Sequence, residues 1–505
     1  MSNHSGEIQS VFTLFNTLGR QLQPFQPLVS GKAGFYGCGP TVYNYAHIGN
    51  LRAYITHDVL VRALRRFGYE VNHVMNITDV GHLSGDNDEG EDKMVKSAAE
   101  RGKTVLEIAD YYTQAFFKDT DRLNIVRPSV VCKATDHIPE MIDLIKRLEE
   151  RGFTYLAGGN LYFDISKFPR YGDLALLRLD EQKAGARVGA DENKRNAGDF
   201  VLWFTKSKFE NQALVWDSPW GRGYPGWHIE CSAMGMKYLG ETFDIHAGGI
   251  DHIPVHHTNE IAQSEAATGK NPCVKYWVHN EFLVMDKGKM SKSSGGFLTL
   301  QTLVDAGYDP LDYRYFLLGG HYRSQLQFSY TALDGAKNAR KSLSDKIRTL
   351  FSTANEHEPA LEERNDTMSS GGSHDSWLKR FENSNAIEYL ANFDKALCDD
   401  LSTPRALAEL WGVLKDTSIS PADALAAAFD MDAVLGLNLR EEADKRAGSH
   451  DEDPAFAAEI ENLIQKRKEA KEARDYGRAD EIRQQLKEKG ITLEDSPAGT
   501  LWRRS

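Results

Sequence analysis

A short strand, a turn and a helix follow one another directly between residues 35 and 67. Phe35 to Cys38 form an apolar, aromatic run, Gly39-Pro40 interrupts it, and apolar residues recur at helical spacing from Leu51 to Phe67. In open α/β sheets, ligands bind where a strand of this kind ends, and the first turn of the helix presents free backbone N–H groups to phosphate. The predicted fold class is therefore α/β, with a Rossmann-like parallel sheet and a ligand site at this turn.

The segments that follow extend this pattern. Tyr69 to Ile77 alternates as a strand, which completes a β-α-β unit and implies a parallel sheet with a right-handed crossover. The α/β pattern returns over residues 240–280, and the chain becomes mostly helical after Leu318. Other predicted elements are strands at 11–18 and 161–165, amphipathic helices at 94–123 and 136–151, and a mobile loop at 182–196.

Length and local composition predict several domains. A chain of 505 residues is long enough for more than one domain. Low hydrophobicity over Thr353–Ser373 and a charged run over Asp444–Pro454 predict two linkers. We expect an α/β domain over residues 1–345 with an inserted subdomain at about 125–225, a helical bundle over 374–443, and a small C-terminal domain over 455–505.

Two helical patterns support the last two domains. Thr403 is predicted as the N-cap of a bundle helix with Pro404 in its first turn. One apolar stripe follows, which predicts a bundle core: Leu407, Leu410, Trp411 and Leu414. In the C-terminal domain, Ile464–Gly490 reads as a helical pair, and residues 466–489 hold nine basic and six acidic residues. On charge alone, this pair is most simply a solvated surface with i,i+4 ion pairs.

Composition excludes several classes of protein. The net charge of −13, from 60 Lys and Arg against 73 Asp and Glu, gives no overall signal for a polyanion partner. Five cysteines without a CxxC pair argue against a disulfide framework and for a reducing compartment. The N-terminus has no signal pattern, and no stretch is apolar over the length that spans a bilayer. We expect a cytoplasmic protein without a membrane partner, and a monomer.

Two short motifs carry a family resemblance. His47-Ile48-Gly49-Asn50 resembles the HIGH signature of class I aminoacyl-tRNA synthetases, with Asn50 where the usual last letter is His, and Lys289-Met290-Ser291-Lys292-Ser293 matches their KMSKS signature. Cys38, nine residues before His47, is similar to a zinc-ligating cysteine of the cysteinyl-tRNA synthetase family. The resemblance extends from residues 15–18 to residues 502–504. It implies that residues 1–345 are catalytic, that 374–443 bind the tRNA stem, and that 455–505 bind the anticodon.

Further cysteine, histidine and glutamate residues suggest a metal site. In helical geometry His256 and Glu260 face the same way, as two ligands of one ion require. Spacing alone leaves the set open, because His252 or His257 could compete and buried cysteines are often inert. The resemblance selects Cys38, Cys231, His256 and Glu260 as ligands of one Zn²⁺ per chain, a donor set that suits zinc. Cys132, Cys273 and Cys398 are taken as structural, and His82 and His137 receive no role.

The resemblance also implies a reaction. Cysteine attacks the α-phosphate of ATP to form cysteinyl adenylate, which is then transferred to the terminal ribose of tRNA(Cys), with Mg²⁺ accompanying ATP. His47, Lys289 and Lys292 are the expected catalytic residues, acting by positioning and charge stabilisation. The expected ATP contacts are His47, Gly49, Gly249, Asp251 and Lys292. Thr41 and Trp227 are expected to contact cysteine, although a core tryptophan is an equal alternative for Trp227.

Two other functions compete with this one. The cysteine ligase of mycothiol synthesis resembles the catalytic domain but lacks an anticodon domain, so residues 444–505 favour the synthetase. A non-catalytic nucleotide- or RNA-binding module would not need the KMSKS motif or the four zinc positions. The acidic run at 81–92 fails the ligand spacing of a calcium loop, which predicts a solvated loop instead. No segment resembles a hydrolytic editing domain.

Overall fold

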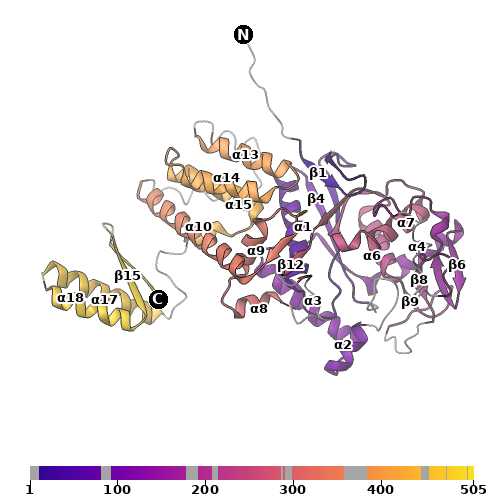
Figure 1. The fold of residues 1–505 in the computed structure, drawn as a ribbon, viewed down its shortest axis with the longest axis horizontal. Helices are drawn as coiled ribbons and strands as arrows, with labels where there is room; N and C mark the ends of the chain where they lie inside the picture. The colour runs from indigo at the N-terminus through magenta and orange to yellow at the C-terminus, as the bar shows by residue number, and fades with distance from the viewer. Residues whose placement is uncertain are drawn as a thin grey trace, which may run out of the picture.

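A five-stranded parallel sheet forms the centre of the molecule (Figure 1). The computed structural model describes residues 11–80, 93–177, 192–206, 214–285, 288–289, 298–357, 381, 384–444, 454–473, 475–496 and 499–504. The strand order is β11-β10-β3-β4-β5, and every pair is parallel. The strands are β3 (Lys32–Gly37), β4 (Glu70–Ile77), β5 (Val130–Lys133), β10 (Phe243–Gly249) and β11 (Val274–Asn280). The predicted α/β class with a parallel sheet is confirmed.

The predicted strand-turn-helix unit is present at the centre of this sheet. Helix α1 (Ile48–Arg66) follows β3, and it begins three residues before the predicted start. Its buried face consists of residues at helical spacing, including Leu51, Ile55 and Val59, which explains why the pattern was readable. β3 ends at Gly37, so Cys38 lies just beyond the carboxyl end of the strand.

One predicted helix is in fact two. The pattern at 94–123 divides into α2 (Lys93–Arg101) and α3 (Val105–Arg122). Gly102 takes a φ of +62° between them, and Thr104 caps α3 by accepting a hydrogen bond from the backbone N–H of Glu107. The prediction at 136–151 is confirmed as α4 (Ile138–Glu150), after a 3-10 turn at Ala134–His137.

A second, antiparallel sheet lies in the chain between β5 and β10, within the residues of the expected insertion. Its order is β6 (Thr154–Ala157), β7 (Asn160–Phe163), β8 (Phe200–Phe204) and β9 (Tyr224–Pro225). The predicted strand at 161–165 starts one residue earlier and ends at Phe163, because Ile165 begins a 3-10 turn. The other short strands are β1 (Thr13–Asn16), β2 (Gln21–Pro24), β12 (Leu283–Met285), β13 (Gly288–Lys289) and β14 (Leu326–Phe328).

Helices dominate the remainder of the chain. Helix α6 (Trp227–Leu239) packs against β3 and β4, and α7 (His256–Thr268) packs against α6. The later helices are α8 (Leu300–Asp305), α9 (Pro310–Leu318), α10 (Tyr330–His357), α13 (Ala386–Cys398), α14 (Thr403–Lys415), α15 (Pro421–Leu435) and α16 (Leu439–Asp444). The predicted linker at 353–373 is wrong at its start, because α10 continues to His357; its remainder lies outside the described residues. Thr403 is the first residue of α14 rather than its cap, which is Ser402.

The predicted apolar stripe packs as a bundle core. Leu407, Leu410 and Leu414 are buried, and Trp411 is partly buried with its Nε1 donating to the Tyr315 hydroxyl at 2.9 Å. The bundle shares one buried cluster with the sheet, since Phe35 of β3 and Leu410 belong to the same core.

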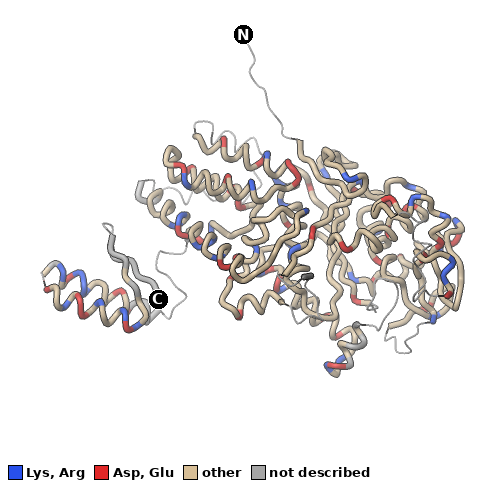
Figure 2. Tube along the Cα trace, viewed as in Figure 1, with Lys and Arg blue, Asp and Glu red and all other residues tan. Residues whose placement is uncertain are grey.

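The last elements form a small unit with its own core. Helices α17 (Pro454–Glu472) and α18 (Tyr476–Glu488) pack together and are followed by the hairpin β15 (Ile491–Ser496) and β16 (Gly499–Arg504). Ile460, Ile482 and Leu486 fill the space between them. The first helix starts ten residues before the predicted Ile464, and both helices carry basic and acidic residues side by side (Figure 2).

In the described part of the chain, no helix combines the length and apolarity that a membrane crossing needs. The acidic run 81–92 with His82, most of the predicted loop at 182–196 and the linker residues 445–453 lie outside the described residues.

Candidate active site and metal-binding cluster

A cavity of about 390 Å³ lies at the carboxyl end of β3, where the sequence predicts a ligand site. Its walls come from the turn after β3, the start of α1, the end of β10 and the start of α6. Seven predicted site residues line it: Cys38, Thr41, His47, Gly49, Trp227, Gly249 and Asp251. Lys289 lies in β13, but its side chain and the whole of Lys292 are outside the described residues.

His47 is held at the start of α1 by a capping box. Its Nδ1 accepts a hydrogen bond from the backbone N–H of Asn50 at 3.1 Å, and the Asn50 side chain accepts from the backbone N–H of His47 at 3.3 Å. Asn50, the one departure from the HIGH pattern, therefore serves as the reciprocal cap. A Cβ at position 49 would lie 3.0 Å from the His47 ring, so a larger residue there would push the ring from this place.

The turn after β3 is equally restricted. The backbone N–H of Gly39 donates to Asn76 Oδ1 at 2.8 Å, and a Cβ at position 39 would overlap the carbonyl oxygen of Asn76. This close approach holds the turn after β3 against the end of β4, next to Cys38.

Four of the predicted residues gather beside the cavity. Cys38 follows β3, Cys231 lies on α6, and His256 and Glu260 lie one turn apart on α7. One ligand atom from each lies within 4.8 Å of the others, and all four side chains are buried. We call these four residues the two-thiol set.

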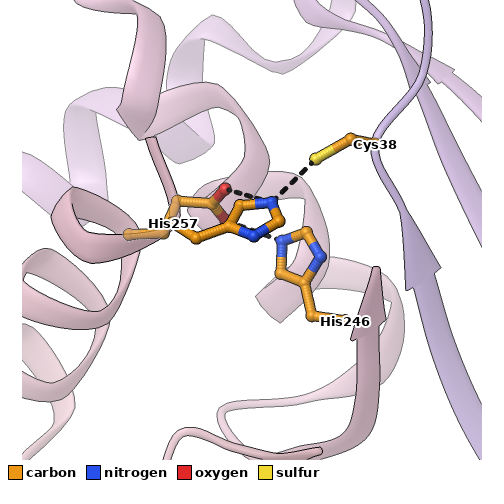
Figure 3. Close-up of side chains that lie close together, drawn as sticks. Cys38, His246 and His257 are labelled. Atoms are coloured by element: carbon orange, nitrogen blue, oxygen red, sulfur yellow. Dashed lines mark hydrogen bonds and ion pairs between the residues drawn. The ribbon is translucent and has the colours of Figure 1, made fainter. Parts of the chain in front are cut away.

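A second, overlapping set shares two of these residues. It consists of Cys38, Glu260, His246 of β10 and His257 of α7, of which Figure 3 labels Cys38, His246 and His257. We call the six residues of the two sets together the metal-binding cluster. His246 Nε2 lies 2.9 Å from Glu260 Oε2, and His257 Nε2 lies 3.3 Å from Cys38 Sγ. Sequence reasoning missed His246; its alternation with Asp244 on a buried strand was the available signal. His252, the other competitor, belongs to neither set, and its Nδ1 lies 3.2 Å from the Gly249 carbonyl.

His257 continues into a chain of buried polar groups. Its Nδ1 lies 2.7 Å from His279 Nε2, and His279 Nδ1 lies 2.7 Å from Thr17 Oγ1. A thiolate only accepts hydrogen bonds, so with Cys38 ionised this chain has one direction. Thr17 then donates to His279, His279 to His257, and His257 to Cys38.

The two-thiol set passes a test of fit to a metal ion. Glu260 Oε1 is buried and makes no well-aligned hydrogen bond, although it lies at ion-pair distance from His256 Nε2, 3.0 Å away. Buried carboxylate oxygens normally have a partner, so an oxygen that faces a nitrogen without bonding to it fits two ligands directed at a common ion. The donors also match zinc, which takes thiolate, imidazole and carboxylate ligands.

Charges within the cluster are strongly coupled. Burial opposes ionisation of Glu260, but His246 and His256 lower its pKa to about 2. Burial disfavours the His256 cation, yet Glu260 and Cys231 raise its pKa to about 10. The carboxylate is thus ionised and His256 holds the compensating proton, which a bound metal cation would replace.

The surroundings of the two thiols, Cys38 and Cys231, favour their neutral forms. Burial raises the pKa of Cys38, and a hydrogen bond with Cys38 together with burial raises that of Cys231. Without a cation both groups are therefore neutral thiols at pH 7. Metal binding here must release protons from sulfur, so the affinity for metal should rise with pH.

The remaining candidates occupy other places. Trp227 is half-buried, lines the cavity and holds its ring 4.5 Å from the ring of His256, so it lies where the cavity meets the metal-binding cluster. His137 Nδ1 lies 2.6 Å from the Lys133 carbonyl and its Nε2 lies 2.8 Å from the Tyr238 hydroxyl, which is a structural arrangement. The other thiols are buried and belong to neither set among the described residues: Cys132, Cys273 and Cys398.

Two family models match the chain. Residues 24–338 match the model described as "tRNA synthetases class I (C) catalytic domain". Residues 453–503 match "Cysteinyl-tRNA ligase anticodon binding domain".

Relatives named "Cysteine--tRNA ligase" match nearly the whole chain. The protein from Treponema denticola is 58% identical over 500 residues, covering 97% of this chain and 99% of the relative. The proteins from Treponema pallidum (strain Nichols) and Borrelia hermsii are 47% and 45% identical, again covering 97% of this chain and 99% of each relative.

Solved structures share the fold at low identity. A Mycobacterium tuberculosis methionyl-tRNA synthetase in complex with methionyl-adenylate is 16% identical, with a TM-score of 0.55 over 85% of this chain and 96% of that chain. A leucyl enzyme of Agrobacterium radiobacter K84, in a ternary complex described as "LeuRS-tRNA-LeuAMS", is 11% identical, with a TM-score of 0.55 over 83% and 85%.

Proposed function

Because the chain belongs to the cysteinyl-tRNA synthetase family of class I enzymes, we propose that its cavity and metal-binding cluster together select cysteine, activate it and pass it to tRNA. The enzyme is a cysteine–tRNA ligase, which consumes ATP and proceeds through cysteinyl adenylate. The observation that carries the proposal is that the cavity and the metal-binding cluster adjoin each other. Cys38 and Trp227 adjoin the metal-binding cluster and also line the cavity that begins at His47.

The two-thiol set is the proposed zinc site. If Cys38, Cys231, His256 and Glu260 are the ligands, His246 and His257 each face a ligand and act as its outer hydrogen-bonding partner. Such partners orient metal ligands and tune their basicity. The other set would leave the buried Cys231 thiol and His256 beside the ion without a role. The two-thiol set therefore uses all six groups, which is the reason for preferring it.

Zinc held there would bind the substrate thiolate as a further ligand, since zinc can expand its coordination. This chain's own residues do the rest of the selection. Trp227 forms part of the cavity wall next to His256, and Thr41 lines the same cavity at the turn where the amino acid must sit. Excluding water from this wall strengthens every polar contact made to the substrate.

Adenylation takes place at the start of α1 in this proposal. The His47 ring, at the positive end of the α1 dipole, donates to the phosphates of ATP, which brings Mg²⁺ with it. The backbone N–H groups of Ile48 and Asn50 are already bonded to Leu298 and His47, so the ring is the donor that this turn offers. Gly49 and Gly249 allow the nucleotide to approach the backbone, and Asp251 accepts from the ribose hydroxyls. Lys289 and Lys292 neutralise charge on the departing pyrophosphate, so no protein nucleophile is needed.

The remaining parts of the chain engage tRNA. We assign residues 1–345 to catalysis, with the insertion at about 125–225, residues 374–443 to the tRNA stem and residues 455–505 to the anticodon. The anticodon assignment is supported by the C-terminal family model at 453–503. The same segment argues against a cysteine ligase that acts on an amino sugar, because such an enzyme has no use for an anticodon-binding unit.

Two assays test this function. Purified enzyme should exchange labelled pyrophosphate into ATP only when cysteine is present, and should then charge tRNA(Cys). Exchange without charging of any tRNA would point to the amino-sugar ligase. The absence of exchange would point to a non-catalytic nucleotide- or RNA-binding module. The cytoplasmic location and the monomeric state stay predictions.

A further inference from the structure

Two tyrosines are exposed at the edge of the cavity. Tyr45 of the turn before α1 is 37% exposed, and Tyr111 of α3 is 44% exposed. Their hydroxyl oxygens lie 2.6 Å apart. We call these two residues, with the Tyr112 ring behind them, the tyrosine ledge. Exposed aromatic rings that adjoin one another form an apolar patch, and such patches can mark binding sites.

The ledge is held rigidly from below. Tyr112 is 1% exposed, and its ring meets the Tyr45 ring edge-on at 5.0 Å and the Tyr111 ring at 5.1 Å. Tyr112 also belongs to a buried apolar cluster with Ile108 and Ala109 of the same helix. The exposed rings are thus already fixed, so a flat partner could stack on them with little loss of conformational entropy.

Two cations surround the ledge. Lys103 Nζ lies 5.2 Å from the centre of the Tyr111 ring, and the Arg101 guanidinium lies 5.3 Å from that of Tyr112. Arg101 is the last residue of α2 and Lys103 lies between α2 and α3, and both are exposed. Aromatic rings interleaved with cations are the combination that binds single-stranded nucleic acid.

The carboxylates on the same helix face are already engaged. Glu107 closes the capping box of α3 by accepting from the backbone N–H and the hydroxyl of Thr104, both at 2.8 Å. Asp110 pairs with Lys133 at 2.6 Å. The hydrogen bond with Tyr111, aided by burial, raises the pKa of Tyr45 to about 12, so its phenol stays neutral. Lys133 therefore offsets the charge of Asp110, whereas Glu107 stays ionised and serves to order the start of α3.

The ledge is continuous with the reaction site. Tyr45 and Tyr112 line the same cavity as His47 and Asp251. Transfer of cysteine requires the terminal ribose of tRNA to reach the adenylate in this cavity, so the unpaired nucleotides beside that ribose must cross its edge. Every base offers a flat face for stacking, whatever its sequence.

We propose that the tyrosine ledge receives the unpaired 3′ end of tRNA, with one base stacked on Tyr111 and Tyr45 and the adjoining phosphates near Lys103 and Arg101. This inference rests on the proposed function, because it takes tRNA as the second substrate. Tyr111 and Tyr45 are positioning residues for the transfer step and have no part in adenylate formation.

The test compares two tRNAs on single-site variants. Tyr111→Ala removes a stacking ring that does not line the cavity, and Tyr111→Phe retains the ring while removing its hydroxyl. Leu106→Ala is the matched control, because Leu106 lies on the same helix and is 49% exposed. Binding is measured for tRNA(Cys) and for the same tRNA lacking its unpaired 3′ nucleotides, alongside cysteine-dependent pyrophosphate exchange.

We expect Tyr111→Ala to bind intact tRNA about fivefold or more weakly, which is the lower end of the stacking contribution of one base. The shortened tRNA should bind the variant and the wild type equally, and Tyr111→Phe and Leu106→Ala should resemble the wild type. Pyrophosphate exchange should be unchanged. Equal affinity of Tyr111→Ala and wild type for intact tRNA would overturn the proposal, as would an equal loss with both tRNAs. Failure of the wild type to charge tRNA would instead reject the proposed function.

Discussion

Replacing Cys231 and His257 in turn distinguishes the two possible ligand sets. Both sets contain Cys38 and Glu260, but only one contains Cys231 and only the other contains His257. If the two-thiol set binds zinc, Cys231→Ser should lose the stoichiometric metal. His257→Leu should retain one zinc per chain with reduced affinity, because it removes an outer partner rather than a ligand.

The size of the His257 effect follows from its contacts. The substitution removes one N–H group 3.3 Å from Cys38 Sγ and interrupts the chain through His279 to Thr17. Losing an outer partner of this kind lowers metal affinity by about 10- to 100-fold, or about 1.4–2.7 kcal/mol. The loss in Cys231→Ser should be larger, since a neutral hydroxyl replaces an anionic ligand. His257→Gln is the matched control, because its amide can still donate to Cys38 and should recover part of the affinity.

Elemental analysis would measure the zinc content of each variant, and competition with a chromophoric chelator would measure its zinc affinity on the same preparation. Thermal unfolding of each variant would separate metal loss from failure to fold. Stoichiometric zinc in Cys231→Ser together with zinc loss in His257→Leu would refute the two-thiol set and identify the second set as the site.

Three further predictions concern other parts of the chain. Lys292→Ala should slow pyrophosphate exchange, because it removes about 2–4 kcal/mol of transition-state stabilisation. An unchanged exchange rate would remove Lys292 from the mechanism. Deleting residues 445–505 should preserve exchange but weaken a salt-dependent charging of tRNA, and equal charging by the two proteins would contradict the anticodon assignment. Burial lowers the pKa of His57 to about 3. As pH falls below about 6.5, this histidine therefore becomes protonated in the unfolded chain while it stays neutral in the native protein. Stability should then fall by up to about 1.4 kcal/mol per pH unit for this group, and His57→Phe should reduce the change in unfolding midpoint between pH 7 and pH 5; an identical change in both proteins would refute this.

Local sequence patterns were sufficient to predict the strand and the helix beside the cavity. The run from Phe35 to Phe67 was readable because strand, turn and helix depend on neighbouring residues, and the structure places β3 and α1 there. The break between α2 and α3 was missed, although Gly102 and the Thr104 capping box were visible signals. Amphipathic periodicity continued across the break and outweighed them.

The surroundings of the metal-binding cluster depend on distant pairings. His246 lies near Cys38 because β10 lies beside β3 with His246 opposite Tyr36, and His279 reaches His257 because β11 lies beside β10 with Gly248 opposite His279. Thr17 joins them through a backbone hydrogen bond to the Trp277 carbonyl. Strand order and register are not visible in one segment, so these three residues could not be assigned from spacing.

Selectivity between cysteine and serine tests the central claim most directly. The measurement is the rate of pyrophosphate exchange with each amino acid, in zinc-loaded enzyme and in the same enzyme depleted of zinc. A hydrophobic pocket alone distinguishes an added hydroxyl by only about 100-fold. We predict selectivity well above this value when zinc is bound, because the metal favours the thiolate over the less acidic hydroxyl, and a steep loss of it on depletion. Selectivity that is the same with and without zinc would contradict a metal-bound substrate thiolate.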